Sequence, residues 1–302
     1  MKQTSPVSPT LLEGIRYFTP PDGYMLSGRD GMVAISWQKK PPIPLLAEDF
    51  AAAEATEVPD YDMVGRGIYQ ALRLNPECVG AAEYGAVLKE AYPHIVSELG
   101  GQIIMLEAKE VDTPYIDRKI NFLKIMTLLD PDNAGLPLEI ARAFVDKGSR
   151  LSSLHTAVSS WYAAEKHLKA SLALNPDDRN AIYEYGEVLY VLGRYEQAAD
   201  IWSGIIGELE PAERARVEAR IAGILAGKTP MVPPLDYLTA LSVAVEQHHN
   251  GCSDDAAEII KDVLADEIFS AQFPMNEVYY LLGTCYRDVG LIAESAEAFK
   301  RS

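Results

Sequence analysis

The chain has 302 residues, 48% of them hydrophobic and 24% charged, which is enough for one large domain or two ordinary ones. Its 27 lysines and arginines face 44 aspartates and glutamates, so the net charge is −17. Because an acidic surface repels phosphate groups, we expect no nucleic-acid partner and no binding to an anionic membrane. The sequence contains no run of about 18 uncharged apolar residues, so we also expect no transmembrane helix.

The cysteines indicate the compartment. Cys78, Cys252 and Cys285 are far apart and form no C-x-x-C pair. A sparse, odd set suits a reducing compartment better than a disulfide framework. Residues 1–6 lack the apolar run of a signal peptide. We therefore expect a cytoplasmic protein.

Residues 1–46 form a segment in which prolines recur, and these prolines exclude long helices. Two short apolar runs, 24–26 and 32–37, flank the glycine-rich residues 27–31 and predict a β-hairpin. An isolated hairpin is only marginally stable in water, so this one should pack on the rest of the chain. It either covers one end of a helical array or serves as a docking arm for a partner.

Residues 47–302 have a helical pattern. Ile182, Tyr185 and Leu189, for example, fall on one stripe, and short Pro, Gly, Asn or Asp breaks separate such segments. No strand pattern lies between them. The pattern predicts an all-α class for this part of the chain.

One sequence motif recurs: a predicted apolar helix ends at Asn or Asp followed by proline. It occurs at Asn75-Pro76, Asp130-Pro131 and Asn175-Pro176. The residue before a proline disfavours the helical conformation, and proline cannot donate to the helical hydrogen-bond ladder. We expect each of these prolines to lie in the first turn of the next helix.

These features resemble the tetratricopeptide repeat family, whose unit is a helix–turn–helix of about 34 residues with a W-x2-L-G-x2-Y…A-x3-F…P pattern. The resemblance covers roughly residues 60–302. It is strongest at 160–210 and 276–302, while residues 60–176 look degenerate or expanded. It implies a right-handed superhelical solenoid of helix pairs behind the N-terminal arm. The residues that match best are Ile182, Tyr185, Gly186, Leu189, Ala198, Trp202, Tyr279, Leu282, Gly283, Tyr286 and Phe299.

The resemblance also implies a concave groove lined by the first helix of each pair. The groove would bind a protein segment or peptide, and tyrosines suit such a surface because they give large contact area at low entropic cost. The alternative is that several of them are half-buried packing residues. The lysines and asparagines that grip a chaperone's C-terminal carboxylate in some family members have no counterpart here, and the acidic lining favours a neutral or basic partner. The candidate protein-binding residues are Arg142, Tyr183, Glu187, Tyr190, Tyr237, Tyr280, Thr284 and Arg287.

Signatures of catalysis are missing from the sequence, which has no GxxxxGK[ST], HExxH or GxSxG motif. We therefore predict no enzyme, no cofactor and no metal. His248-His249 near Cys252 could contribute to a metal site, but a polar helix end is the favoured interpretation. We interpret Gly65-Arg66-Gly67 as a loosened helix start.

Three functional hypotheses follow. The first is a scaffold or adaptor that binds a protein segment in its groove. The second is a structural component of a homo-oligomer or larger assembly that uses the N-terminal arm and the uncovered face of the last repeat. The third is an enzyme with an unrecognised site, which would need a buried cluster of titratable groups in a pocket.

Overall fold

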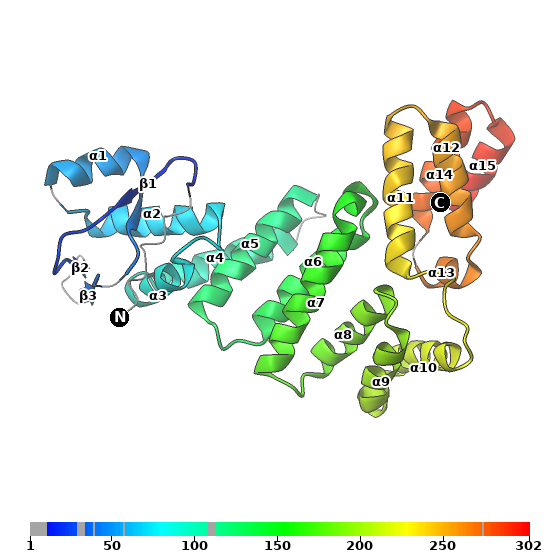
Figure 1. The fold of residues 1–302 in the computed structure, drawn as a ribbon, viewed down its shortest axis with the longest axis horizontal. Coiled ribbons are helices and arrows are strands. Elements are labelled where there is room, and N and C mark those ends of the chain that lie inside the picture. Colours follow the sequence, from blue (N-terminus) through cyan, green and yellow to red (C-terminus); the bar gives the residue numbers. More distant parts are fainter. Residues whose placement is uncertain (1–10, 29–33, 39, 57, 108–112, 274) are drawn as a thin grey trace, which may run out of the picture. The chain divides into compact units, whose positions relative to one another are not determined.

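The structure is a computed structural model that describes residues 11–302 except 29–33, 39, 57, 108–112 and 274. It divides into two compact units, Met1–Leu136 and Pro137–Ser302. Figure 1 labels the α-helices of both units, and each unit is described separately below.

Four short strands come first among the described residues of the first unit. β2 (Met25–Ser27) pairs antiparallel with β3 (Ala34–Ser36), which confirms the predicted hairpin. Most of its glycine-rich turn lies outside the described residues. β1 (Ile15–Phe18) also pairs antiparallel with β4 (Ile43–Leu46), and this pairing was not predicted. Pro44 within β4 concealed it, because proline is tolerated in a strand only where its missing N–H faces an open edge.

The strands of the first unit share one core with its helices. Leu26, Ile35 and Ile43 are buried in the same hydrophobic cluster as Ile68 and Leu72. The hairpin therefore packs on the helices, as expected for a two-stranded hairpin that would be only marginally stable by itself. These helices are α1 (Ala47–Thr56), α2 (Tyr61–Leu74), α3 (Ala81–Ala91), α4 (His94–Glu107) and α5 (Thr113–Leu129).

Two glycines allow close packing on α2. A Cβ at Gly67 would lie 1.9 Å from the backbone oxygen of Pro44, and one at Gly65 would lie 2.5 Å from the ring of Tyr92. Both positions therefore need glycine so that β4 and Tyr92 can approach the helix. The interpretation of these glycines as a loosened helix start was wrong, because they lie in the first half of a regular helix with Asp60 as its N-cap.

The second unit consists of helices. Consecutive helices pack against each other as α8–α9, α11–α12 and α14–α15 (Figure 1), which is the predicted helix-pair arrangement. Its elements are α6 (Gly135–Ser149), η1 (Leu151–Thr156), α7 (Ala157–Leu174), α8 (Arg179–Val191), α9 (Tyr195–Ile205), η2 (Ile206–Glu208), α10 (Pro211–Leu225), α11 (Pro234–His249), α12 (Ser253–Leu264), α13 (Glu267–Gln272), α14 (Asn276–Asp288) and α15 (Ile292–Arg301).

The Asn/Asp-Pro closures end helices as expected. Asn75 caps α2 and Asn175 caps α7, each donating its backbone N–H to the carbonyl four residues earlier. The expectation that the following prolines begin the next helix was wrong. Pro176, for example, lies in a turn, and Asp178 provides the N-cap of α8. The turn is needed because the chain must reverse direction between antiparallel helices.

Candidate functional site

Two neighbouring pockets lie in the second unit. We call the first the charged pocket; it has a volume of about 360 Å³ and combines apolar walls with ionised side chains. It is positioned by α6, α7, α8 and α10, with Phe273 following α13. Its lining residues are Arg142, Val145, Asp146, Trp161, Tyr183, Glu184, Glu187, Val188, Val191, Arg216 and Phe273.

The second, which we call the apolar pocket, has a volume of about 490 Å³. It shares Asp146 and Phe273 with the charged pocket, so the two pockets adjoin, and we call them together the recess. Polar groups, including Arg150 and Glu277, contribute to its lining. Its other lining residues are Ser149, Leu151, Leu154, Leu238, Leu241, Met275, Asn276 and Val278.

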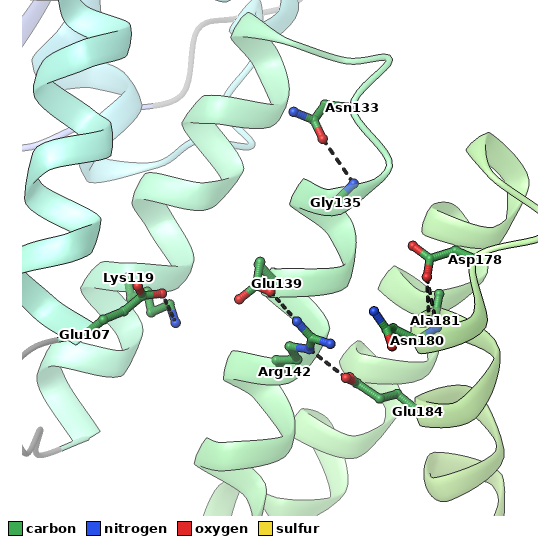
Figure 2. Close-up of polar contacts among 10 residues, drawn as sticks. All are labelled: Glu107, Lys119, Asn133, Gly135, Glu139, Arg142, Asp178, Asn180, Ala181 and Glu184. Carbon is green, nitrogen blue, oxygen red and sulfur yellow. Dashed lines mark hydrogen bonds and ion pairs between the residues drawn. The ribbon is translucent and has the colours of Figure 1, made fainter. Parts of the chain in front are cut away.

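Arg142 on α6 joins two carboxylates. Its Nε donates to Glu184 Oε1 on α8 at 2.6 Å, and its Nη1 donates to Glu139 Oε1 at 2.5 Å (Figure 2). Burial opposes the charge of Arg142, but the two ion pairs outweigh it and raise its pKa. Burial also raises the pKa of Glu184, although Arg142 acts in the opposite direction. The pair therefore fixes α6 against α8 at the charged pocket.

Tyr183 and Glu187 lie one turn apart on α8, and each contacts an arginine of α10. The hydroxyl of Tyr183 accepts a hydrogen bond from Arg216. Glu187 Oε2 accepts one from Arg220 Nη1 at 2.6 Å, and its Oε1 is buried with no partner among the described residues. Residues four apart share a helix face, so Tyr183 and Glu187 on α8 can each meet one of the arginines on α10, Arg216 and Arg220. We call these two contacts the α8–α10 ladder.

Arg220 is the buried member of this ladder, at 9% exposure. Its guanidinium lies 4.6 Å from the ring centroid of Tyr190 and 5.7 Å from that of Trp202. A carboxylate and aromatic rings both offset the desolvation of a buried guanidinium, and Glu187 and these two rings supply them.

Two candidate binding residues are buried packing residues in this structure. Tyr190 is 1% exposed and lies in a cluster with Trp202. Tyr237 is 8% exposed, and its hydroxyl donates to Asp266 Oδ2 at 2.8 Å. Burial raises the pKa of Tyr237 to about 12, and the hydrogen bond to Asp266 adds to the shift. We therefore leave Tyr190 and Tyr237 out of the proposed binding surface.

The three candidates on α14 line neither of these pockets. Tyr280 is 58% exposed, with its ring centroid 5.5 Å from that of Phe299. Thr284 donates its hydroxyl proton to the carbonyl of Leu281, at 2.6 Å on the same helix. Arg287 is exposed beside Asp288, with 3.5 Å between Nε and Oδ1. The structure thus brings together Arg142, Tyr183 and Glu187, but not the α14 residues.

Sequence reasoning missed several pocket residues. Trp161 and Phe273 were not proposed because large apolar residues usually belong to the core, and the two pockets form only when the helices pack. Arg216 lies four residues before Arg220, a spacing that places both arginines on one face of a helix. The sequence alone did not single out this helix, α10, so Arg216 was not proposed.

Other candidate chemistry does not converge on these pockets, whose described lining includes no cysteine or histidine. The helix-end interpretation of His248 fits: α11 ends beside it, and its Nδ1 lies 3.2 Å from Ser253 Oγ and 3.7 Å from Cys285 Sγ. Within the described ranges, no group of three or more His, Cys, Asp or Glu side chains could hold a metal ion. In the same ranges, no helix combines the length and apolar character needed to cross a membrane.

Comparison with known proteins identifies one segment. Residues 157–205, which span α7 to α9, match the family model described as tetratricopeptide repeat. No curated protein matches the chain. Two solved structures described as MamA are 17% and 18% identical; they cover 69% and 64% of this chain and 88% and 94% of their own chains. Their TM-scores of 0.27 and 0.25 are too low for these structures to inform the fold or the role.

Proposed function

We propose that this chain, whose residues 157–205 match the tetratricopeptide-repeat model, is a non-enzymatic scaffold that binds a segment of another protein in the charged and apolar pockets. The observation that carries this proposal is the pair of adjoining pockets that share Asp146 and Phe273 in their linings. Repeat proteins use extended surfaces of this kind for binding.

The polar lining of the recess supports binding rather than chemistry. Arg142 pairs with Glu184, Arg150 with Asp146 and Arg220 with Glu187. Paired charges hold a fixed geometry, and Tyr183 adds an amphipathic contact beside the apolar walls. A partner helix or extended segment would insert apolar side chains between these fixed polar groups.

We also propose a neutral or basic partner segment overall, because the net charge of −17 favours basic partners at long range. A cytoplasmic location belongs to the same proposal. It is supported by the three free cysteines, of which Cys78 and Cys285 are buried. Burial raises the pKa of both thiols, to about 11 for Cys285, which keeps them protonated and unreactive at neutral pH.

Affinity capture from the source cells, followed by mass spectrometry, tests this function. The variant bait carries Tyr183→Ala and Phe273→Ala, which remove side chains from the recess. The matched control bait carries Tyr280→Ala and Arg287→Ala, which lie on α14 outside both pockets. We expect a partner that the wild type and the control retain and the recess variant loses, with unchanged circular dichroism for all three.

Recovery of the same partners by all three baits would refute binding in the recess. Recovery mainly of the protein itself would favour the second candidate, a component of a larger assembly. The exposure of Val289 and Leu291 before α15, and of Ile292 at its start, supports that alternative, because exposed apolar groups favour association.

A further inference from the structure

Arg216 is the unusual charge in the charged pocket. In the described part of the chain it pairs with no carboxylate, and its side chain contacts Tyr183 instead. The guanidinium carbon lies 5.7 Å from the ring centroid of Tyr183. Arg220, one turn further along α10, already holds the carboxylate of Glu187 at 2.6 Å. The carboxylate that would balance Arg216 is therefore not supplied by the described residues.

The surroundings of Arg216 favour an added anion. Partial burial and the positive charge of Arg220 both lower the pKa of Arg216, so its charged form is less well stabilised than that of a fully solvated arginine. Arg216 is an exposed residue, and an anion placed beside its guanidinium would offset both effects by direct charge attraction.

The hydroxyl of Tyr183 completes the donor set. It accepts a hydrogen bond from Arg216, so its own proton is available to a second acceptor. A guanidinium N–H and a phenolic O–H can together bind the two oxygens of one carboxylate. Val145 and Phe273 are partly exposed in the same pocket and would contact an apolar group next to that carboxylate.

We propose that Arg216 and the hydroxyl of Tyr183 bind the side-chain carboxylate of an aspartate or glutamate in the partner segment, and that a large apolar neighbour of this residue occupies the pocket. This inference rests on the proposed function. It specifies one acidic contact within a segment that is otherwise neutral or basic. Discrimination comes from Arg216, since an acidic residue elsewhere along the recess would meet the carboxylates of Glu184 and Asp146.

A library of random peptides displayed on phage, selected on the full chain, tests the proposal. The displayed peptides have no free C-terminus, so any acidic preference reports a side chain. The variant is Arg216→Glu. The matched control is Arg118→Glu on α5, where Arg118 lies 5.8 Å from the ring centroid of Tyr115 in a similar exposed Arg–Tyr pair. The control makes the same change in net charge outside the pocket.

We expect peptides selected on the wild type and on the control to carry Asp or Glu next to a large apolar residue. Peptides selected on Arg216→Glu should lose that preference. Replacing the acidic residue of an enriched peptide by Lys should weaken binding to the wild type by about tenfold, the size expected for one charge-assisted contact, and should strengthen binding to Arg216→Glu. Fluorescence anisotropy measures both affinities.

The outcomes separate the two proposals. Peptides that need Tyr183 and Phe273 but show no acidic preference would overturn the Arg216 assignment and leave the recess as the binding surface. The same acidic preference on Arg216→Glu would also overturn it. If every enriched peptide bound the Tyr183→Ala, Phe273→Ala variant as well as the wild type, the recess itself and this inference would both fail.

Discussion

At the residue scale, Gly186 determines how closely α8 and α9 approach. A Cβ at this position would lie 2.2 Å from Trp202 Nε1 and 2.6 Å from the indole ring. Trp202 cannot easily move, because it is fully buried and its Nε1 donates to the carbonyl of Tyr183 at 3.1 Å. The glycine therefore positions the tryptophan that packs against the ring of Tyr190 and donates to the backbone carbonyl of Tyr183.

We expect Gly186→Ala to lower the free energy of unfolding by about 1–3 kcal/mol, the usual cost of inserting a methyl group into a packed core. The control is Gly204→Ala on α9, where a Cβ meets no atom within 4 Å. That variant should be neutral or slightly more stable, because alanine favours the helix. Urea unfolding followed by circular dichroism gives both values; equal stability of the two variants would contradict the packing argument.

At the element scale, Asp266 connects α13 with α11 and the segment before it. Its Oδ1 accepts from the backbone N–H of Ile268 and Phe269, both at 3.0 Å, and so caps α13. Its Oδ2 accepts from Met231 N–H at 2.7 Å and from the hydroxyl of Tyr237 at 2.8 Å. Burial opposes ionisation of Asp266, yet these hydrogen bonds outweigh it and lower its pKa.

Because the folded pKa is below the unfolded value, the carboxylate of Asp266 contributes its full stabilisation above about pH 4 and loses it as the pH falls through the folded pKa. We expect Asp266→Asn to lower the free energy of unfolding by about 1–3 kcal/mol at neutral pH, since its NH₂ group would face two donors. The difference from wild type should shrink below about pH 4.

Urea titrations over this pH range measure the effect. Asp262→Asn, an exposed substitution on α12, serves as the control and should change stability little. A difference between Asp266→Asn and wild type that stays constant down to the acid transition would show that the charge of Asp266 does not matter.

At the scale of the whole molecule, each buried cluster lies within one unit. The two clusters of the second unit contain residues from Leu138 onward, and the cluster of the first unit ends at Leu129. A unit with its own core can fold alone. The right-handed superhelix implied by the family resemblance depends on the stacking of successive repeats, and it stays a prediction.

We expect a fragment of residues 130–302, which keeps α6 complete, to fold with a cooperative thermal transition and native helix content. Circular dichroism and the near-ultraviolet signal of Trp161 and Trp202 would show it. A fragment with helix content but no cooperative transition would mean that the second unit needs the first for its packing.

The sequence by itself determined the helix-pair class, the hairpin and the helix ends. These features depend on local rules: apolar spacing of three and four residues, proline and Asn/Asp breaks, and glycine-rich turns. The family pattern around Gly186 and Gly283 also came from the sequence, because a small residue must oppose the large Trp202 and Phe299 in each pair.

Only the tertiary structure decided which side chains of α8 face a recess and which enter the core. Tyr183 and Tyr190 lie on one helix and looked equivalent, but Arg220 and Trp202 cover Tyr190, whereas Tyr183 lines the charged pocket with Arg216. The sequence could not supply this difference, nor the pairing of β1 with β4. Both depend on contacts between residues far apart in the chain, and the periodicity of a single helix or strand carries no information about its neighbours.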